Sequence, residues 1–262
     1  MAKSKLRVDQ LLVERGLAES RSMAQRLVMA GQVRAGGELV HKSSETVAAD
    51  EALEVEGNPP FVSRAGEKLE ASLDTFQIST EGRICADVGS STGGFTDCLL
   101  QRGAQRVYAI DVGKGQLHWK LRQDDRVVTL ERTNARYLKE LPEAVSLVTV
   151  DVSFISALLI LAQASKWLMG QGDLVVLIKP QFEAGPEKIG KGGIVKDPLV
   201  HRAVLEKITQ GAQELGLHTH GLIRSPVRGA KGNQEFLAWL RPLRGDASLE
   251  ELIDSVLPRN GE

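Results

Sequence analysis

The sequence predicts an α/β protein with two parts, a small N-terminal α+β module and a larger doubly wound domain with a seven-stranded sheet. From residue 83 onward, short apolar segments that suit buried strands alternate with segments that suit helices. Only residues 225–234 separate the last two strand segments, which leaves no room for a crossover helix, so the last strand should be antiparallel. The composition changes near residues 56–60, where Gly57, Pro59 and Pro60 disfavour a helix and suit a linker.

These observations divide the 262 residues into four segments. We expect a small module over residues 1–57 and a linker over residues 58–62. The larger domain should occupy residues 63–245, and residues 246–262 should form a short acidic tail with helical character.

The N-terminal module should contain two helices and a β hairpin. Helical patterns over residues 6–16 and 20–31 each end at a glycine, and residues 32–40 contain a Gly-Gly turn. Eight Lys and Arg against four Asp and Glu give residues 1–42 a net charge of +4, whereas the whole chain carries −1. Such side chains can contact nucleic-acid phosphates, although charge alone favours an ordinary solvated helix surface. The candidates are Arg7, Arg15, Arg21, Arg26, Arg34 and Lys42.

The larger domain should begin with a helix over residues 63–76, which Ser63 could cap. Further helices are expected over residues 155–168 and 198–215. The seven expected strands are Ile84–Val88, Arg106–Ile110, Val127–Leu130, Ser146–Val152, Leu174–Lys179, His218–Arg224 and Glu235–Leu240.

A glycine-rich turn follows the first of these strands and carries the first functional signal. The strand ends at Asp87 and Val88, and the turn then reads Gly89, Ser90, Ser91, Thr92, Gly93, Gly94 and Phe95. Glycines allow a close backbone approach to a ligand, and an acid after the next strand, Asp111, can bind ribose hydroxyls. The spacing is not the G-x-G-x-x-G of dinucleotide sites, which leaves S-adenosylmethionine or a tight turn without a ligand.

Charged side chains at other strand ends should meet at the same edge of the sheet. Asp151 and Lys179 end two strands, and Glu235 begins the antiparallel last strand. Lys68 lies beside the apolar face of the preceding helix, where a lysine is usually a surface residue. Lys179 follows four apolar residues, although it could also reach solvent as a strand-end charge.

Together, Lys68, Asp151, Lys179 and Glu235 resemble the Lys-Asp-Lys-Glu tetrad of ribose 2′-O-methyltransferases related to FtsJ. This resemblance implies a class I methyltransferase fold, S-adenosylmethionine as cofactor, and Lys179 as the base or the group that orients the ribose hydroxyl. The cofactor-contacting residues would be Asp87, Gly89, Ser90, Ser91, Thr92, Gly93, Gly94, Phe95, Asp111, Val112, Asn134, Ala135 and Asp151.

The N-terminal pattern Leu-Arg-Val-Asp, followed by Ser-Arg-x-x-Ala, resembles the S4 RNA-binding domain. An S4 module followed by this methyltransferase domain resembles the TlyA family, also labelled hemolysin A. The match is sharpest at residues 63–69, 87–96 and 179–183. Membership would imply 2′-O-methylation of cytidine in ribosomal RNA of the large subunit and, in some members, of the small subunit.

Residues 184–196 follow Lys179 closely and combine glycines with lysines. We interpret this segment as a loop that orders on RNA through Lys188, Lys191 and Lys196, with an ordinary exposed loop as the alternative.

Other features of the sequence bear on metal binding, secretion and membrane insertion. No His, Cys or Asp cluster has the spacing of metal ligands, and Cys85 and Cys98 suit buried reduced thiols, so we expect no metal. We find no secretory signal, and the most apolar run, Phe154–Ala162, is too short to span a bilayer, so we expect a cytoplasmic protein. The alternatives are an RNA-binding protein with an inactive methyltransferase-like domain, an S4-bearing pseudouridine synthase, or a secreted pore-former, which the hemolysin label suggests.

Overall fold

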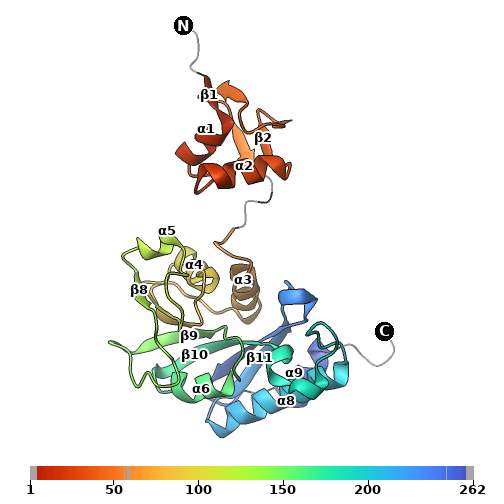
Figure 1. Cartoon of the computed structure of the whole chain (residues 1–262). Helices are drawn as coiled ribbons and strands as arrows, with labels where there is room; N and C mark the ends of the chain where they lie inside the picture. Colours follow the sequence, from red (N-terminus) through yellow and green to blue (C-terminus); the bar gives the residue numbers. More distant parts are fainter. Residues whose placement is uncertain (1–4, 56, 58–59, 246, 258–262) are drawn as a thin grey trace. The chain divides into compact units, whose positions relative to one another are not determined.

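The computed structural model describes residues 5–55, 57, 60–245 and 247–257. The chain divides into two compact units, residues 1–59 and residues 60–262 (Figure 1). Two residues of the expected linker, 58 and 59, and residues 246 and 258–262 of the expected tail lie outside the described residues.

The first unit packs two helices against short strands. Its core contains Val8, Leu12, Leu27 and Val33, all buried. The expected first helix begins two residues late, because Leu6 instead pairs with Val47 in a small antiparallel sheet. The elements are β1 (Lys5–Arg7), α1 (Val8–Glu14), α2 (Arg21–Met29), β2 (Val33–Ala35), β3 (Glu38–Leu39), β4 (Thr46–Ala48) and β5 (Leu53–Val55).

The second unit is built on a seven-stranded sheet in the order β11-β12-β10-β9-β6-β7-β8. Strand β12 runs antiparallel to both of its neighbours, and the other pairs are parallel. The predicted doubly wound sheet with an antiparallel last strand is therefore confirmed. The strands are β6 (Ile84–Val88), β7 (Arg106–Ile110), β8 (Val127–Leu130), β9 (Val145–Val150), β10 (Leu168–Ile178), β11 (His218–Arg224) and β12 (Phe236–Arg241).

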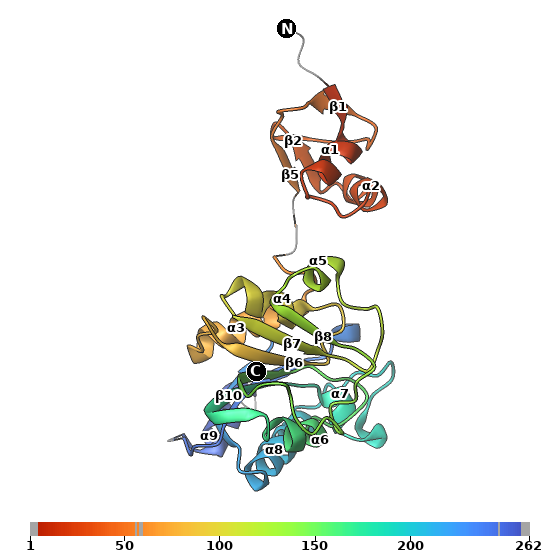
Figure 2. The ribbon, with the colours of Figure 1, turned by 90° about the vertical axis from the view of Figure 1, so that its left-hand side faces the viewer.

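Helices cover both faces of this sheet (Figure 2). One apolar cluster joins α3 and α4 to one face, for example Leu69 and Leu99 with Leu147. The other cluster joins α6, α8 and α9 to the opposite face, for example Leu161 and Ile208 with Val148. Adjacent strand residues thus point to opposite sides, as the pleat requires. The helices are α3 (Ala65–Phe76), α4 (Gly94–Gln101), α5 (Trp119–Arg122), α6 (Leu158–Ala164), α7 (Pro180–Glu183), α8 (Pro198–Glu214) and α9 (Leu249–Val256).

The helix expected over residues 155–168 was predicted too long. Helix α6 spans only Leu158–Ala164, because the backbone before it turns through a positive φ of 63° at Phe154. The buried carboxylate of Glu183 accepts a hydrogen bond from the Ala157 N–H at 2.7 Å. It thus provides a partner for an N–H group at the beginning of the helix, where the helix itself offers none. At the other end, Leu168 already belongs to β10.

Two smaller expectations also need correction. Ser63 is not the N-cap residue of α3, which is Arg64, but the Ser63 hydroxyl oxygen accepts a long hydrogen bond of 3.4 Å from the N–H of Ala65, the first residue of the helix. The segment set apart as a tail contains α9, whose Ile253 and Val256 are buried in the same apolar cluster as Leu222 of β11. This helix is therefore part of the core of the second unit.

Candidate functional site

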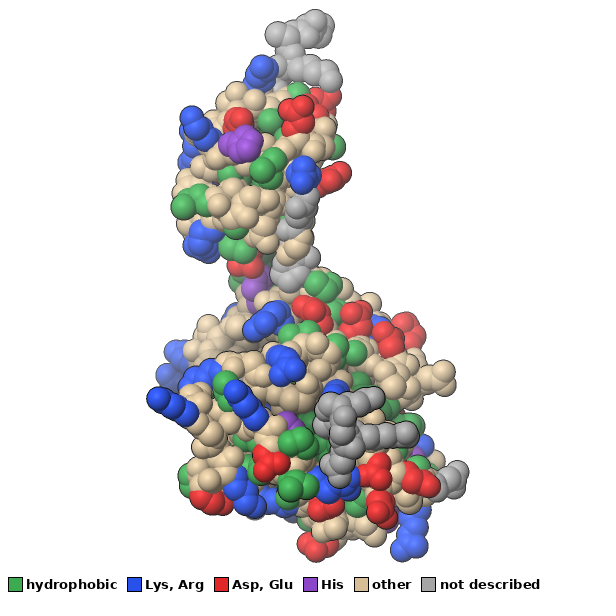
Figure 3. All heavy atoms as spheres, turned by 90° about the vertical axis from the view of Figure 1, so that its right-hand side faces the viewer, with side chains coloured by type: hydrophobic (Ala, Val, Ile, Leu, Met, Phe, Trp, Pro, Cys, Tyr) green, Lys and Arg blue, Asp and Glu red, His purple; other side chains and the backbone are tan. Residues whose placement is uncertain are grey.

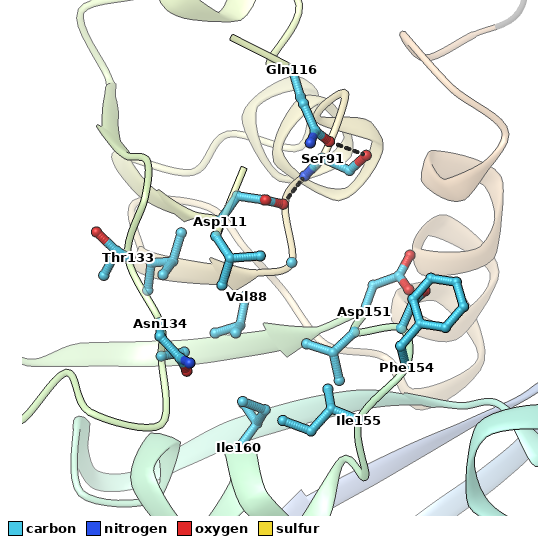
Figure 4. Close-up of a pocket in the computed structure, with 16 residues that line it drawn as sticks. Val88, Ser91, Asp111, Gln116, Thr133, Asn134, Asp151, Phe154, Ile155 and Ile160 are labelled. Carbon is cyan, nitrogen blue, oxygen red and sulfur yellow. Dashed lines mark hydrogen bonds between the residues drawn. The ribbon is translucent and has the colours of Figure 1, made fainter. Parts of the chain in front are cut away.

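A cavity of about 400 Å³ opens at the carboxyl ends of β6, β7 and β9 (Figure 4). Pockets of this size and position in open α/β sheets bind small ligands. Its wall includes seven residues that the sequence had assigned to the cofactor: Gly89, Ser91, Asp111, Val112, Asn134, Ala135 and Asp151. A smaller adjoining cavity is lined by Ser90, Thr92, Gly94 and Phe95 together with Gly89, Ser91 and Asp151.

The turn after β6 is tightly constrained by its neighbours. Gly89 has a φ of 83°, and a Cβ atom on it would lie 2.2 Å from the carbonyl oxygen of Asp151. Asp111 fixes the turn from the other side, since its carboxylate accepts hydrogen bonds from the Ser91 N–H at 2.8 Å and the Gly113 N–H at 2.7 Å. Figure 4 shows Asp111 beside Ser91 at the edge of the cavity. The acid is thus held where it can accept further bonds from ribose hydroxyls.

Asp87 does not reach either cavity, contrary to the expectation from the sequence. It is fully buried and accepts hydrogen bonds from Thr96 Oγ1 at 2.6 Å and Thr149 Oγ1 at 3.1 Å. Burial raises the pKa of Asp87 to about 7, against the opposing effect of the two threonine hydrogen bonds. Its carboxyl group ties β6, α4 and β9 together beneath the turn. Gly93 also lines neither cavity. A Cβ atom added at this position would lie 2.2 Å from the side chain of Leu121.

The four residues of the proposed tetrad form two ion pairs. Lys179 Nζ lies 2.5 Å from Asp151 Oδ1 and donates a hydrogen bond to Ser153 Oγ at 3.0 Å. Lys68 Nζ donates to Glu235 Oε2 at 2.6 Å, and both of these side chains are largely buried. Lys68 is therefore not the surface lysine that its place in the sequence suggested.

Two residues next to these ion pairs were not predicted from the sequence. Gln181 Nε2 donates a hydrogen bond to Glu235 Oε1 at 3.0 Å. Phe154 is 90% exposed despite its size, lines the cavity, and lies 4.8 Å from the ring of Phe182. The apolar run that begins at Phe154 led to the prediction of a helix from residue 155 onward, and a positive φ at a phenylalanine cannot be recognised from the sequence. Hydrophobic and aromatic side chains together with a few polar groups are the usual lining of a ligand pocket.

The basic residues assigned to RNA lie on the surface, but several also hold the fold together. Arg7 and Arg21 contact the buried Asp9, and Arg15 donates to the carbonyl oxygens of Ala49 and Glu51. Arg26 contacts the sulfur of Met23 and Arg34 the carbonyl oxygen of Gly37, and Lys42 is exposed. On the face drawn in Figure 3, basic side chains lie on both units with acidic side chains among them.

The lysine-bearing segment after α7 is partly fixed by hydrogen bonds within the protein. Lys188, Lys191 and Lys196 are all exposed. The side chain of Asn233 accepts from the Val195 N–H at 3.0 Å and donates to the Gly193 carbonyl at 2.9 Å. The end of this segment is therefore anchored without a ligand.

Comparison with known proteins assigns the chain to a family. The model of FtsJ-like methyltransferases matches residues 61–242, which include the whole glycine-rich turn and both ion pairs. The chain belongs to the FtsJ-like methyltransferase family. The S4 domain model matches residues 6–53, in the first unit. Membership confirms the predicted enzyme class and its cofactor, S-adenosylmethionine.

Several relatives match most of this chain. The chain is 46% identical over 257 residues to the 16S/23S rRNA (cytidine-2′-O)-methyltransferase TlyA of Mycobacterium tuberculosis, covering 95% of each chain. It is 44% identical over 236 residues to Hemolysin A of Brachyspira hyodysenteriae, covering 89% of this chain and 98% of that protein. A solved structure from Streptococcus thermophilus, described as a candidate hemolysin, matches with a TM-score of 0.72 at 45% identity and covers 97% and 96% of the two chains.

The residues around the cavity fit S-adenosylmethionine. The volume suits a nucleoside ligand, Asp111 offers an acid for ribose hydroxyls, and Ile110 and Ile160 give an apolar wall near Asn134.

In the described part of the chain, no group of three or more His, Cys, Asp or Glu side chains could hold a metal ion. No helix among the described residues is both long and apolar enough to cross a membrane.

Proposed function

We propose that this protein methylates the ribose 2′-hydroxyl of a cytidine in ribosomal RNA. The observation that carries the proposal is the ion pair of Lys179 and Asp151, because Asp151 also lines the cavity that fits the cofactor. The TlyA relative named above, identical at 46% of positions across nearly the whole chain, supports the ribosomal substrate and the cytidine. The S4 match supports RNA as the class of substrate.

The four tetrad residues have distinct roles in this proposal. A ribose hydroxyl is a weak nucleophile and must lose its proton as it attacks. S-adenosylmethionine, when bound, supplies an electrophilic methyl group. Lys179, which Asp151 and Ser153 hold in place, gives up one proton to water before the reaction, and its neutral amine then orients the hydroxyl and receives its proton as the methyl group is transferred. Lys68 and Glu235 form the second, more buried pair, which fixes this side of the site.

Phe154 is the residue that would receive the target base. A nucleotide inside a helix cannot place its ribose against a buried site and has to leave the stack. An exposed ring at the cavity offers the stacking surface that replaces the lost neighbours. The basic side chains of the S4 module and Lys188, Lys191 and Lys196 would contact the phosphates of the same RNA.

Transfer of tritium from labelled S-adenosylmethionine to isolated large and small ribosomal subunits tests the proposal. Wild-type protein should label at least one subunit, and Lys179→Ala should lose at least 100-fold in single-turnover rate, the order expected for a proton-transfer group. Cofactor affinity, measured by calorimetry, should stay unchanged. Absence of label from wild-type protein that binds the cofactor would reject the ribosomal substrate and favour an RNA-binding role without this chemistry.

A further inference from the structure

The S4 module contains a buried carboxylate that holds two of its arginines together. Asp9 is 0% exposed and lies at the start of α1. Its Oδ1 accepts from Arg7 Nε at 3.0 Å, and its Oδ2 accepts from Arg7 Nη2 at 2.9 Å and Arg21 Nη2 at 3.1 Å. Gln25 Nε2 adds a longer bond of 3.4 Å to the same oxygen.

This arrangement brings two positive charges close together near the surface. Because both Nη2 atoms contact Asp9 Oδ2, they are no more than about 6 Å apart. Two guanidinium groups at this distance repel each other, and the carboxylate between them offsets the repulsion. The same contacts hold the pKa of the Asp9 carboxyl well below its usual range, chiefly through the hydrogen bond from Arg7.

The two arginines are anchored at one edge while the rest of each side chain remains accessible. The side chains of Arg7 and Arg21 are 39% and 53% exposed. A guanidinium has five N–H donors, and within the described residues Asp9 takes two from Arg7 and one from Arg21. Donors in this rigid fork suit phosphate oxygens, and anchoring removes rotamer freedom before any ligand binds.

We propose that Asp9 is a positioning residue that presents Arg7 and Arg21 as a preformed site for RNA phosphodiester groups. The proposal rests on the RNA substrate proposed above and adds the internal acid that organises the contact. It explains why a module that binds a polyanion keeps a negative charge between two of its arginines. The cluster retains a net positive charge of one, because two arginines face one carboxylate.

Asp9→Asn is the direct test, measured on the full chain. The protein is titrated with isolated large and small ribosomal subunits, and the dissociation constant is read by fluorescence anisotropy of a labelled protein. Asparagine keeps the shape but weakens both arginine contacts, so binding should weaken about tenfold although one negative charge is lost. The matched control is Glu14→Gln, which removes one exposed carboxylate from the same helix and should leave binding equal or slightly tighter.

A mutant cycle separates positioning from a structural effect. In the background of Arg7→Ala and Arg21→Ala, Asp9→Asn should cause no further loss of binding beyond twofold, because nothing remains to be positioned. If Asp9→Asn fails to fold, Arg7→Lys decides the matter with the core intact. Lysine keeps the charge but lacks the fork, so it should lose most of what Arg7→Ala loses.

Equal or tighter RNA binding by Asp9→Asn at unchanged melting temperature would overturn the proposal. So would wild-type affinity in Arg7→Lys. If wild-type protein binds neither subunit, the proposed ribosomal substrate fails instead, which is a separate outcome.

Discussion

The buried carboxyl of Asp87 makes the stability of the second unit depend on pH in a predictable direction. The folded protein holds its pKa at about 7, whereas an unfolded chain gives an aspartate about 3.9. The folded state therefore binds this proton more tightly than the unfolded state. Stability from this group is unaffected below about pH 4, falls as the pH rises, and is lowest above pH 7.

Asp87→Asn removes this titration with little change of shape. The Thr96 and Thr149 hydroxyls can rotate to pair with an amide, so the fold should be retained. A pKa difference of about 3 corresponds to about 4 kcal/mol over the whole range. Of this, about 2.5 kcal/mol falls between pH 5 and pH 8, and the variant should gain that much over wild type across the interval.

Urea unfolding followed by tryptophan fluorescence measures the free energy of unfolding of the second unit. All three tryptophans, at positions 119, 167 and 239, belong to the second unit. The quantity to plot is the stability difference between Asp87→Asn and wild type at pH 5, 6, 7 and 8. The matched control is Asp125→Asn, which alters an exposed carboxyl and should give a flat difference. A flat line for Asp87→Asn as well would refute the reasoning.

Three further variants test other parts of the structure. Gly89→Ala places a Cβ 2.2 Å from the carbonyl of Asp151, so calorimetry should find S-adenosylmethionine binding weakened at least tenfold; unchanged binding would mean that the turn is not the cofactor contact. Ile253→Ala in α9 should cost about 3 kcal/mol in urea unfolding, as for a core residue, whereas a loss below 0.5 kcal/mol would mean that α9 does not belong to the core of the second unit. Gln181→Leu removes the donor to Glu235 and should lower the methyl-transfer rate about tenfold at unchanged cofactor affinity; a wild-type rate would show that this hydrogen bond has no role in the site.

The sequence predicted the sheet well because its strands are short apolar runs that end in recognisable residues. The order of strands and helices fixed which carboxyl ends meet, and so Asp111 and Asp151 were placed correctly at the cavity. The antiparallel last strand followed from the ten-residue connection before it, which a crossover helix could not fill.

The details that the sequence did not predict all depend on tertiary contacts. The division of four charged residues into two ion pairs depends on which side chains face each other across the sheet edge. The burial of Asp87 beneath the turn depends on Thr149, which lies 62 positions away in the sequence. Phe154 is exposed and has a positive φ, whereas a phenylalanine at the start of an apolar run would be expected in the core.

The position of the methyl group on the product RNA tests the central claim most directly. Ribosomal subunits are treated with the protein and S-adenosylmethionine, the RNA is digested to nucleosides, and these are separated by mass spectrometry. The proposed chemistry at Lys179 and Asp151 predicts 2′-O-methylcytidine, formed at least 100-fold more slowly by Lys179→Ala in samples taken over time. A methyl group on the base, or an undiminished yield from Lys179→Ala, would contradict the assignment of this site to ribose methylation.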